Sequence, residues 1–136
     1  MSRKVAREAL YQLVFEYLFL KDVNDDTLEL MLIDNGLSED DREYIRDCYL
    51  GISKDCDVLI EEISGYTVDF KIDRVYKMDL AAIIIALYEI KNRKDIPVAV
   101  SVNESINIVK KFSTDKSYSY VNGVLAGLIK SYKDNA

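Results

Sequence analysis

The stretch "LAAIIIALYEI" (residues 80–90) decides the fold, because it is apolar on nearly every side. Its length, its alanines and its Tyr-Glu-Ile ending favour a helix over a strand, although its isoleucines are β-branched. A helix that is apolar all round must be buried by neighbours on every side. Asp79, directly before it, is predicted to cap its start. We therefore expect the core to form around this helix.

Helical spacing also dominates the chain before this stretch. Apolar residues at one-turn spacing predict a first helix over residues 3–20 and a shorter apolar segment over 28–33. Ser38 offers an N-cap for a long third helix, whose apolar stripe runs over residues 44–63.

Two further helices are predicted after it. Pro97 is expected at the first position of one of them, where proline is well tolerated. The last is predicted over about residues 115–132, with Tyr118 facing inward. Gly123 and Gly127 are one turn apart, which is expected to let another helix backbone approach closely. No stretch convincingly predicts a strand, so the chain is predicted to be all-α, a compact bundle of about six or seven helices.

Size and composition indicate one folded domain over residues 1–136. Hydrophobic residues make up 49% of the chain, with one proline and five glycines. The longest apolar run, residues 80–88, is far shorter than the roughly 20 residues that span a bilayer, and the start of the chain is basic and polar. Cys48 and Cys56 lie two turns apart on one helix, too far for a disulfide, and are expected to be buried free thiols. A cytoplasmic location is expected.

The residue types present argue against catalysis. The chain has no histidine, which excludes Ser-His and Cys-His dyads and a His-rich metal site. It also contains no P-loop and no GxGxxG motif. We therefore expect neither an enzyme nor a bound cofactor or metal.

Charge is distributed unevenly about a net value of −6. Residues 22–62 hold fourteen acidic and three basic side chains, whereas residues 1–8 hold three basic side chains and one acid. Residues 104–136 hold five lysines and three acids. Basic ends and an acidic middle allow two different partners.

A polar break with three lysines and two tyrosines stands out near the C-terminus, in "NESINIVKKFSTDKSYSYVNGVL" (residues 103–125). This segment is also the closest part of a wider resemblance. Together with "SRKVAREALYQLVF" (residues 2–15) and "FKIDRVYKMDLAAIIIALYEI" (residues 70–90), the stretch from Ile96-Pro97 to Val-Asn-Gly-Val-Leu resembles the NusB family of bacterial transcription antitermination factors. These stretches cover about half the chain, and their order spans nearly all of it.

The resemblance implies a function in transcription. Proteins like NusB bind a short single-stranded boxA RNA together with the ribosomal protein NusE. The complex joins elongating RNA polymerase with other Nus factors and supports transcription of rRNA operons. A similar domain also precedes the catalytic domain of some rRNA cytosine methyltransferases, but this chain has no glycine-rich cofactor loop.

Eight residues are expected to contact RNA. The basic side chains near the N-terminus would follow the phosphates from one face of the first helix, and Tyr120 would stack on a base. The alternatives are a solvated helix end for the cations, and for Asn122 a cap of the preceding loop instead of a contact to a base edge. The full set is Arg3, Lys4, Arg7, Tyr11, Gln12, Lys116, Tyr120 and Asn122.

For the protein partner, the resemblance points to Phe15 and Asp79. An acidic residue suits a basic ribosomal protein. Tyr88 and Glu89 are expected to be structural, with Glu89 paired to a basic group such as Arg74.

The chain departs from the family pattern at several positions. Phe70 stands where tryptophan is usual, and Tyr120 where phenylalanine is usual, so both keep a ring. Lys116 occupies a position that is often acidic, which should raise phosphate affinity more than sequence selectivity. Ala126 replaces an acid, and Phe15 a tyrosine.

One other functional class stays open from the sequence. The chain is alternatively a helical protein-interaction or dimerisation module without RNA binding. Whether it forms a homodimer, and whether RNA binding needs the partner protein, are not decided by the sequence.

Overall fold

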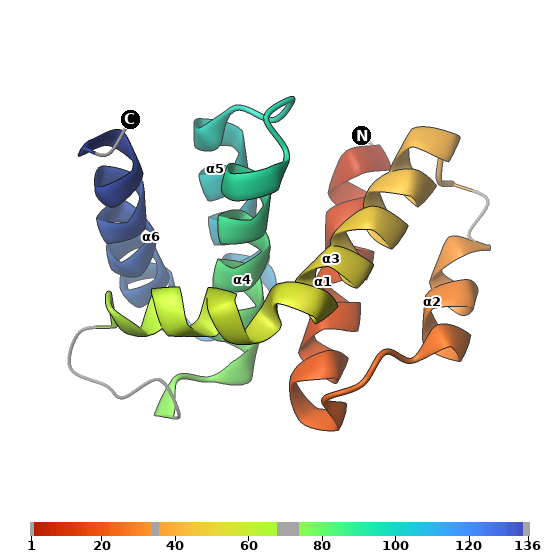
Figure 1. Cartoon of the computed structure of the whole chain (residues 1–136), viewed down its shortest axis with the longest axis horizontal. Coiled ribbons are helices and arrows are strands. Elements are labelled where there is room, and N and C mark those ends of the chain that lie inside the picture. The colour runs from red at the N-terminus through yellow and green to blue at the C-terminus, as the bar shows by residue number, and fades with distance from the viewer. Residues whose placement is uncertain (1, 34–35, 68–73, 135–136) are drawn as a thin grey trace. The chain divides into compact units, whose positions relative to one another are not determined.

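The computed structural model of the chain describes residues 2–33, 36–67 and 74–134. These residues form helices and connecting loops without any strand, which confirms the predicted all-α class. Six helices are present in the described ranges and are labelled in Figure 1: α1 (Ser2–Leu20), α2 (Asp25–Leu32), α3 (Glu39–Ser64), α4 (Lys77–Asn92), α5 (Val98–Phe112) and α6 (Ser117–Asp134). The chain divides into an N-terminal unit, Met1–Asp55, and a C-terminal unit, Cys56–Ala136. The expectation of a single domain stays a prediction.

The N-terminal unit is built from α1, α2 and the first part of α3. Asn24 caps α2, because its side chain accepts a hydrogen bond from the backbone N–H of Thr27 at 3.1 Å. The backbone N–H of Asn24 in turn donates to the Tyr49 hydroxyl at 3.0 Å, which ties the start of α2 to α3. Large side chains of α1 and α3 that are fully buried include Leu10, Leu13, Leu18, Tyr44, Ile45 and Ile52.

The start and end of α3 agree with the sequence prediction. The Ser38 hydroxyl accepts a hydrogen bond from the backbone N–H of Asp41 at 3.1 Å, as expected of an N-cap. The helix then continues to Ser64 without interruption. Cys48 and Cys56 are both buried free thiols, which confirms that prediction.

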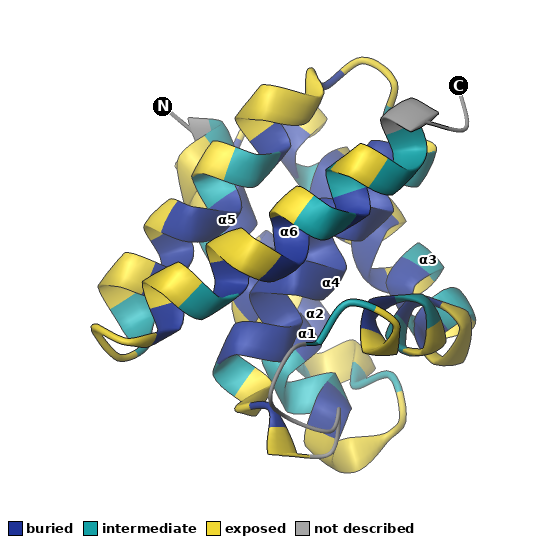
Figure 2. Cartoon of the chain, turned by 90° about the vertical axis from the view of Figure 1, so that its left-hand side faces the viewer, coloured by how far each residue is buried: buried dark blue, intermediate teal, exposed yellow. Residues whose placement is uncertain are grey.

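The C-terminal unit is organised around α4, which packs against α5 and α6. Every residue of α4 from Asp79 to Ile90 is buried. In Figure 2, α4 is dark blue along most of its visible length, whereas α5 and α6 alternate between dark blue and yellow. The Ser105 hydroxyl donates to the Ala82 carbonyl oxygen at 2.7 Å, a buried bond that fixes α5 on α4. The prediction of a helix buried all round is confirmed.

Three local predictions need correction. Pro97 occupies the N-cap position of α5, one residue before the helix starts at Val98. A Cβ atom at Gly123 would meet no atom within 4 Å, so no helix backbone approaches it. Gly127 is closely approached, but by the side-chain ring of Tyr66 and not by a backbone.

Length and apolar character together decide whether a helix can cross a bilayer. Within residues 2–33, 36–67 and 74–134, no helix combines the length and the apolar character needed to do so. The sequence of residues 70–79 also predicts one or two irregular helical turns. Residues 70–73 lie outside the described residues, and residues 77–79 form the start of α4.

Candidate nucleic-acid interface

The polar break between α5 and α6 is held by a cluster of hydroxyl groups. Ser113, at the C-cap of α5, donates a hydrogen bond to Asp79 Oδ1 at 2.6 Å. Its oxygen also lies 3.0 Å from the Ser117 hydroxyl, which is 2.9 Å from that of Thr114. These bonds join the end of α5 and the first turn of α6 to the first turn of α4.

Asp79 has a different role from the one predicted. Helix α4 begins at Lys77 with Tyr76 at the N-cap position, so Asp79 is the third helical residue and not the cap. Its side chain is only 3% exposed and accepts the bond from Ser113. The carboxylate therefore anchors the α5–α6 corner onto α4.

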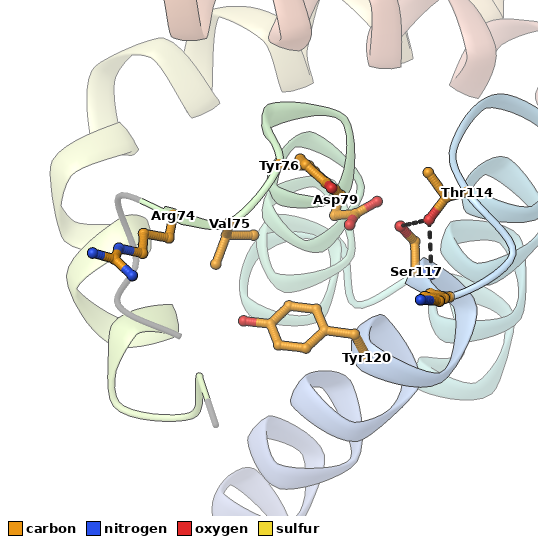
Figure 3. A pocket seen from close by; sticks show the side chains of 8 residues that line it. Arg74, Val75, Tyr76, Asp79, Thr114, Ser117 and Tyr120 are labelled. Carbon is orange, nitrogen blue, oxygen red and sulfur yellow. Dashed lines mark hydrogen bonds between the residues drawn. The ribbon is translucent and has the colours of Figure 1, made fainter. Parts of the chain in front are cut away.

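A pocket of about 330 Å³ opens beside this cluster, and we call it the α4–α6 pocket. Figure 3 shows the Tyr120 ring extending across it from α6, with Thr114 and Ser117 on one side and Arg74 on the other. The lining comes from the residues around the start of α4 and from the start of α6: Arg74, Val75, Tyr76, Asp79, Thr114, Lys116, Ser117 and Tyr120. Two predicted RNA residues, Lys116 and Tyr120, thus meet at one site.

The first two tyrosines of α6, Tyr118 and Tyr120, differ in exposure, and that of Tyr118 contradicts the prediction. Tyr118 is 40% exposed and not in the core, and Lys110 Nζ lies 4.5 Å from the centre of its ring. Tyr120 is half-buried and lines the pocket. The expectation that Tyr118 is a core residue is therefore wrong, whereas the proposed stacking role of Tyr120 stays a prediction.

Asn122 is exposed on α6. Because α6 starts at Ser117, Asn122 lies within the helix and does not cap the preceding loop. The capping alternative is wrong, and the contact to a base edge stays a prediction.

The cations of α1 are engaged within the N-terminal unit. Arg3 Nε donates to Asp41 Oδ1 at 3.0 Å. The guanidinium carbons of Arg3 and Arg7 lie 4.4 Å and 5.7 Å from the centre of the Tyr44 ring, in cation–π contact. Arg7 is only 4% exposed, whereas Lys4 is exposed. Arg7 is therefore not the solvated residue that one alternative assumed, and in this structure its side chain faces α3.

The remaining predicted residues of α1 differ in exposure. Tyr11 is buried and Gln12 is exposed, as expected for neighbours on a helix. Phe15 is half-buried, and its ring packs edge-on against that of Phe19, with the centroids 5.0 Å apart. One RNA can touch both the α1 cations and Tyr120 only if the two lie side by side. Since α1 and α6 belong to different units, this adjacency is a prediction.

Arg74 and Val75 are pocket residues that the sequence did not identify. Arg74 is exposed at the pocket and does not pair with Glu89, which accepts a buried hydrogen bond from Ser101 at 2.7 Å. Glu89 lies near the end of α4, about 18 Å along its axis from the first helical residue, Lys77, whereas Arg74 precedes the helix. The sequence feature that could have identified Arg74 is its position: it is a basic residue shortly before the buried helix, within the stretch that resembles the NusB family.

Metal-ligating groups do not gather in the described parts of the chain. No cluster of three or more His, Cys, Asp or Glu residues there has the arrangement to hold an ion.

Comparison with known proteins identifies the family. Residues 1–130 match the model of the NusB family. The chain is 33% identical to the transcription antitermination protein NusB of Acetivibrio thermocellus, over 96% of this chain and 90% of the relative. It is 36% identical to that of Ruminiclostridium cellulolyticum, with the same shares covered.

A solved structure agrees with these relatives. The structure of T. maritima NusB superimposes with a TM-score of 0.86 at 28% identity, covering 96% of this chain and 92% of that one. Family model, relatives and structure all extend over nearly the whole chain, and the curated relatives carry the name of a transcription antitermination protein and not that of an enzyme. The chain belongs to the NusB family.

Proposed function

We propose that this protein is a transcription antitermination factor that binds a single-stranded boxA RNA element together with the ribosomal protein NusE. In this role the complex joins the elongating RNA polymerase with other Nus factors and supports transcription of rRNA operons. The observation that carries the proposal is the match of residues 1–130 to the NusB family, whose curated relatives are named transcription antitermination proteins.

Exposed cations support the RNA part of the proposal. Lys4 on α1 and Lys116 before α6 are both exposed, as are Lys110 and Lys111 at the end of α5. Because the protein carries a net charge of −6, RNA must bind to local basic surfaces and not to the molecule as a whole. Arg3 and Arg7, on the same helix as Lys4, lie beside Tyr44 and add positive charge there.

Exposed aromatic surface supports the partner contact. Phe19 is 58% exposed, and its ring packs against Phe15. An exposed aromatic ring that packs on a half-buried one is typical of a protein contact. Asp79 is too buried to offer much surface, so we assign its contribution to NusE binding to the α5–α6 corner that it anchors through Ser113.

A mobility-shift experiment with a boxA RNA, with and without NusE, tests the proposal. Lys4→Glu should weaken the shift, because it reverses an exposed charge without disturbing the core. The matched control is Lys54→Glu, an exposed lysine of α3 in the same unit. Arg7→Glu is unsuitable, because it would bury a carboxylate beside Tyr44 and destabilise the fold. Absence of any shift, even with NusE, would rule the proposal out.

The alternative is an interaction or dimerisation module without RNA binding. It is favoured by two exposed apolar side chains at the end of α2, Leu30 and Ile33, which are 67% and 68% exposed. A protein that sediments as a dimer and gives no RNA shift would support this alternative.

A further inference from the structure

We propose that the outward face of α2 docks a basic amphipathic helix of a protein partner. This face consists of Leu30 and Ile33 together with the carboxylates of Asp26 and Glu29, and we call it the α2 stripe. It shares no residue with the contacts proposed for RNA or for NusE. The inference therefore goes beyond the proposed function and does not depend on it.

The four residues of the α2 stripe lie along one side of the helix. Their positions follow the spacing i, i+3, i+4 and i+7, which places side chains in one row on a helix surface. Ile33 is the C-cap residue and still has a helical backbone, so it continues the row. All four side chains are exposed.

The apolar part of the stripe is left in water by the fold. Leu30 and Ile33, at 67% and 68% exposed, are the most exposed large apolar side chains of the described residues. Leu28 and Leu32, on the other side of α2, are buried and hold the helix on the core. Helix α2 thus has a second apolar side, and neighbouring apolar side chains that stay exposed within a charged surface are typical of an interaction site.

Contacts on its inner side hold α2 in place. Eight residues are too few for a stable isolated helix, so other segments must stabilise it. At its start, the Thr27 hydroxyl donates to Glu16 Oε2 at 3.2 Å. At its end, Arg42 Nε donates to the Leu32 carbonyl oxygen at 2.9 Å. The α2 stripe takes no part in these bonds, so a partner can bind to it without disturbing them.

Negative charge determines the kind of partner. Residues 22–41 hold eight acidic side chains and no basic one. Neither Asp26 nor Glu29 forms an ion pair among the described residues. A partner with lysines or arginines beside its own apolar row gains charge complementarity, which fixes orientation and speeds association. A helix suits this surface because rows of side chains on two helices pack against each other.

The same charge argues against other occupants. RNA and anionic lipid surfaces are negative and would be repelled. A second copy of this chain, related by a two-fold axis, would bring the α2 stripe against itself, with acids facing acids. A basic helix avoids both kinds of repulsion.

Binding of a designed peptide to the full chain tests the proposal. The probe is a fluorescent amphipathic peptide with leucines along one side of its helix and lysines beside them, and the control peptide contains the same residues in scrambled order. We expect the amphipathic peptide to bind at least about 10-fold more tightly, because only it presents a continuous apolar row. Equal affinities, or no binding of either peptide, would overturn the proposal.

Matched apolar variants locate the contact. Leu30→Ser should weaken binding of the amphipathic peptide on the order of 10-fold, mainly through faster dissociation. Because Leu30 is exposed, the melting temperature should not change. Leu50→Ser, at an exposed leucine of α3 in the same unit, should leave the affinity unchanged. The same affinity in both variants would place the peptide elsewhere and contradict the proposal.

A second pair of variants tests the charges. Glu29→Lys should slow association of the peptide and reduce its dependence on salt. Asp57→Lys, at an exposed acid of α3 in the other unit, makes the same change in net charge and should have a smaller effect. Identical association rates in the two variants would mean that only the total charge attracts the peptide.

The remaining measurements separate the α2 stripe from the contacts already proposed. The complex with NusE should bind the peptide as the free protein does, and Leu30→Ser should leave the boxA RNA shift unchanged. Competition between NusE and the peptide would assign the stripe to NusE and overturn a separate partner. In sedimentation, a dimer that Leu30→Ser dissociates would show that a second copy covers the stripe. Failure of the protein to bind RNA would overturn the proposed function and leave this inference standing.

Discussion

Tyr132 of α6 is held by a carboxylate that two donors share. Its hydroxyl donates to Glu62 Oε2, and Lys91 Nζ donates to Glu62 Oε1 at 2.9 Å. Burial of the phenol, followed by its hydrogen bond to Glu62, raises the pKa of Tyr132 above its ordinary value of 10.0. The folded state therefore binds this proton more tightly than the unfolded state. The resulting stabilisation is complete below pH 10.0 and is lost as the pH rises through the folded-state pKa.

We predict that the free energy of unfolding decreases between about pH 9 and pH 11, and that it decreases less in Tyr132→Phe. Urea unfolding at both pH values measures this, and at neutral pH the variant should lose about 1 kcal/mol with its hydrogen bond. Part of the decrease of the free energy of unfolding with pH should persist in this variant, since burial also raises the pKa of Tyr49. Tyr118→Phe, at an exposed site, is the control. Identical pH slopes in Tyr132→Phe and the unmodified protein would contradict the prediction.

Side-chain environments at the candidate site were only partly predictable. The spacing of Arg3 and Arg7 indicates one shared face of α1, and both do meet Tyr44. It does not reveal the burial of Arg7, because Tyr44 belongs to another helix. Similarly, a separation of two residues shows that Tyr118 and Tyr120 face different ways, but not which faces the core. Such assignments depend on packing between helices that no local pattern encodes.

Helix α6 contains two glycines in contrasting environments. A Cβ at Gly123 would meet nothing within 4 Å, whereas a Cβ at Gly127 would lie 2.9 Å from Tyr66 Cδ1. Gly123→Ala should therefore stabilise the protein by up to about 1 kcal/mol through helix propensity. Gly127→Ala should destabilise it by about 1 kcal/mol, because overpacking outweighs the same gain in propensity. Thermal unfolding of both variants measures the difference in stability. Equal effects would show that the Tyr66 ring can move away from the new methyl group without destabilising the protein.

The end of α1 carries the one non-glycine residue with positive φ among the described residues, Lys21, at φ 60°. Its backbone N–H donates to the Tyr17 carbonyl oxygen at 2.8 Å and so ends the helix. Lys21→Gly should stabilise the protein by up to about 1 kcal/mol, because glycine adopts this conformation without strain. Lys54→Gly, inside α3, removes the same side chain and should instead cost about 1 kcal/mol. Chemical denaturation should show opposite signs, and a loss in both variants would be inconsistent with strain at Lys21.

The helices themselves were more predictable than their contacts. Apolar periodicity correctly predicted α1 and α3, because amphipathic helices show their buried face in the sequence. The boundaries of α4 were missed by a few residues: the helix starts at Lys77, before Asp79, because Tyr76 takes the N-cap position without a side-chain cap. Without a side-chain hydrogen bond, that start leaves little signal in the sequence. The pocket was not predictable, since it depends on two segments meeting in the folded unit.

The charge of the whole protein opposes the function proposed for part of its surface. The net charge is −6, while the proposed RNA contacts are a few exposed lysines. At an ionic strength of about 0.1 M, charges beyond roughly 10 Å are largely screened, so the lysines act locally while distant acids are felt weakly. At lower salt the acidic residues repel RNA over longer distances. The usual gain in affinity at low salt should therefore be reduced in the free protein.

A basic partner should remove this limitation. We predict that the protein alone binds boxA RNA weakly, with a shallow slope of log affinity against log salt, and that NusE strengthens binding and steepens the slope. The physical reason is that the partner both neutralises acidic surface and adds phosphate contacts, each contributing about −0.7 to the slope for single-stranded RNA. Fluorescence anisotropy across a salt series, with and without NusE, measures affinity and slope together. Equal affinity in both series would mean that the exposed lysines of this chain alone suffice for RNA binding.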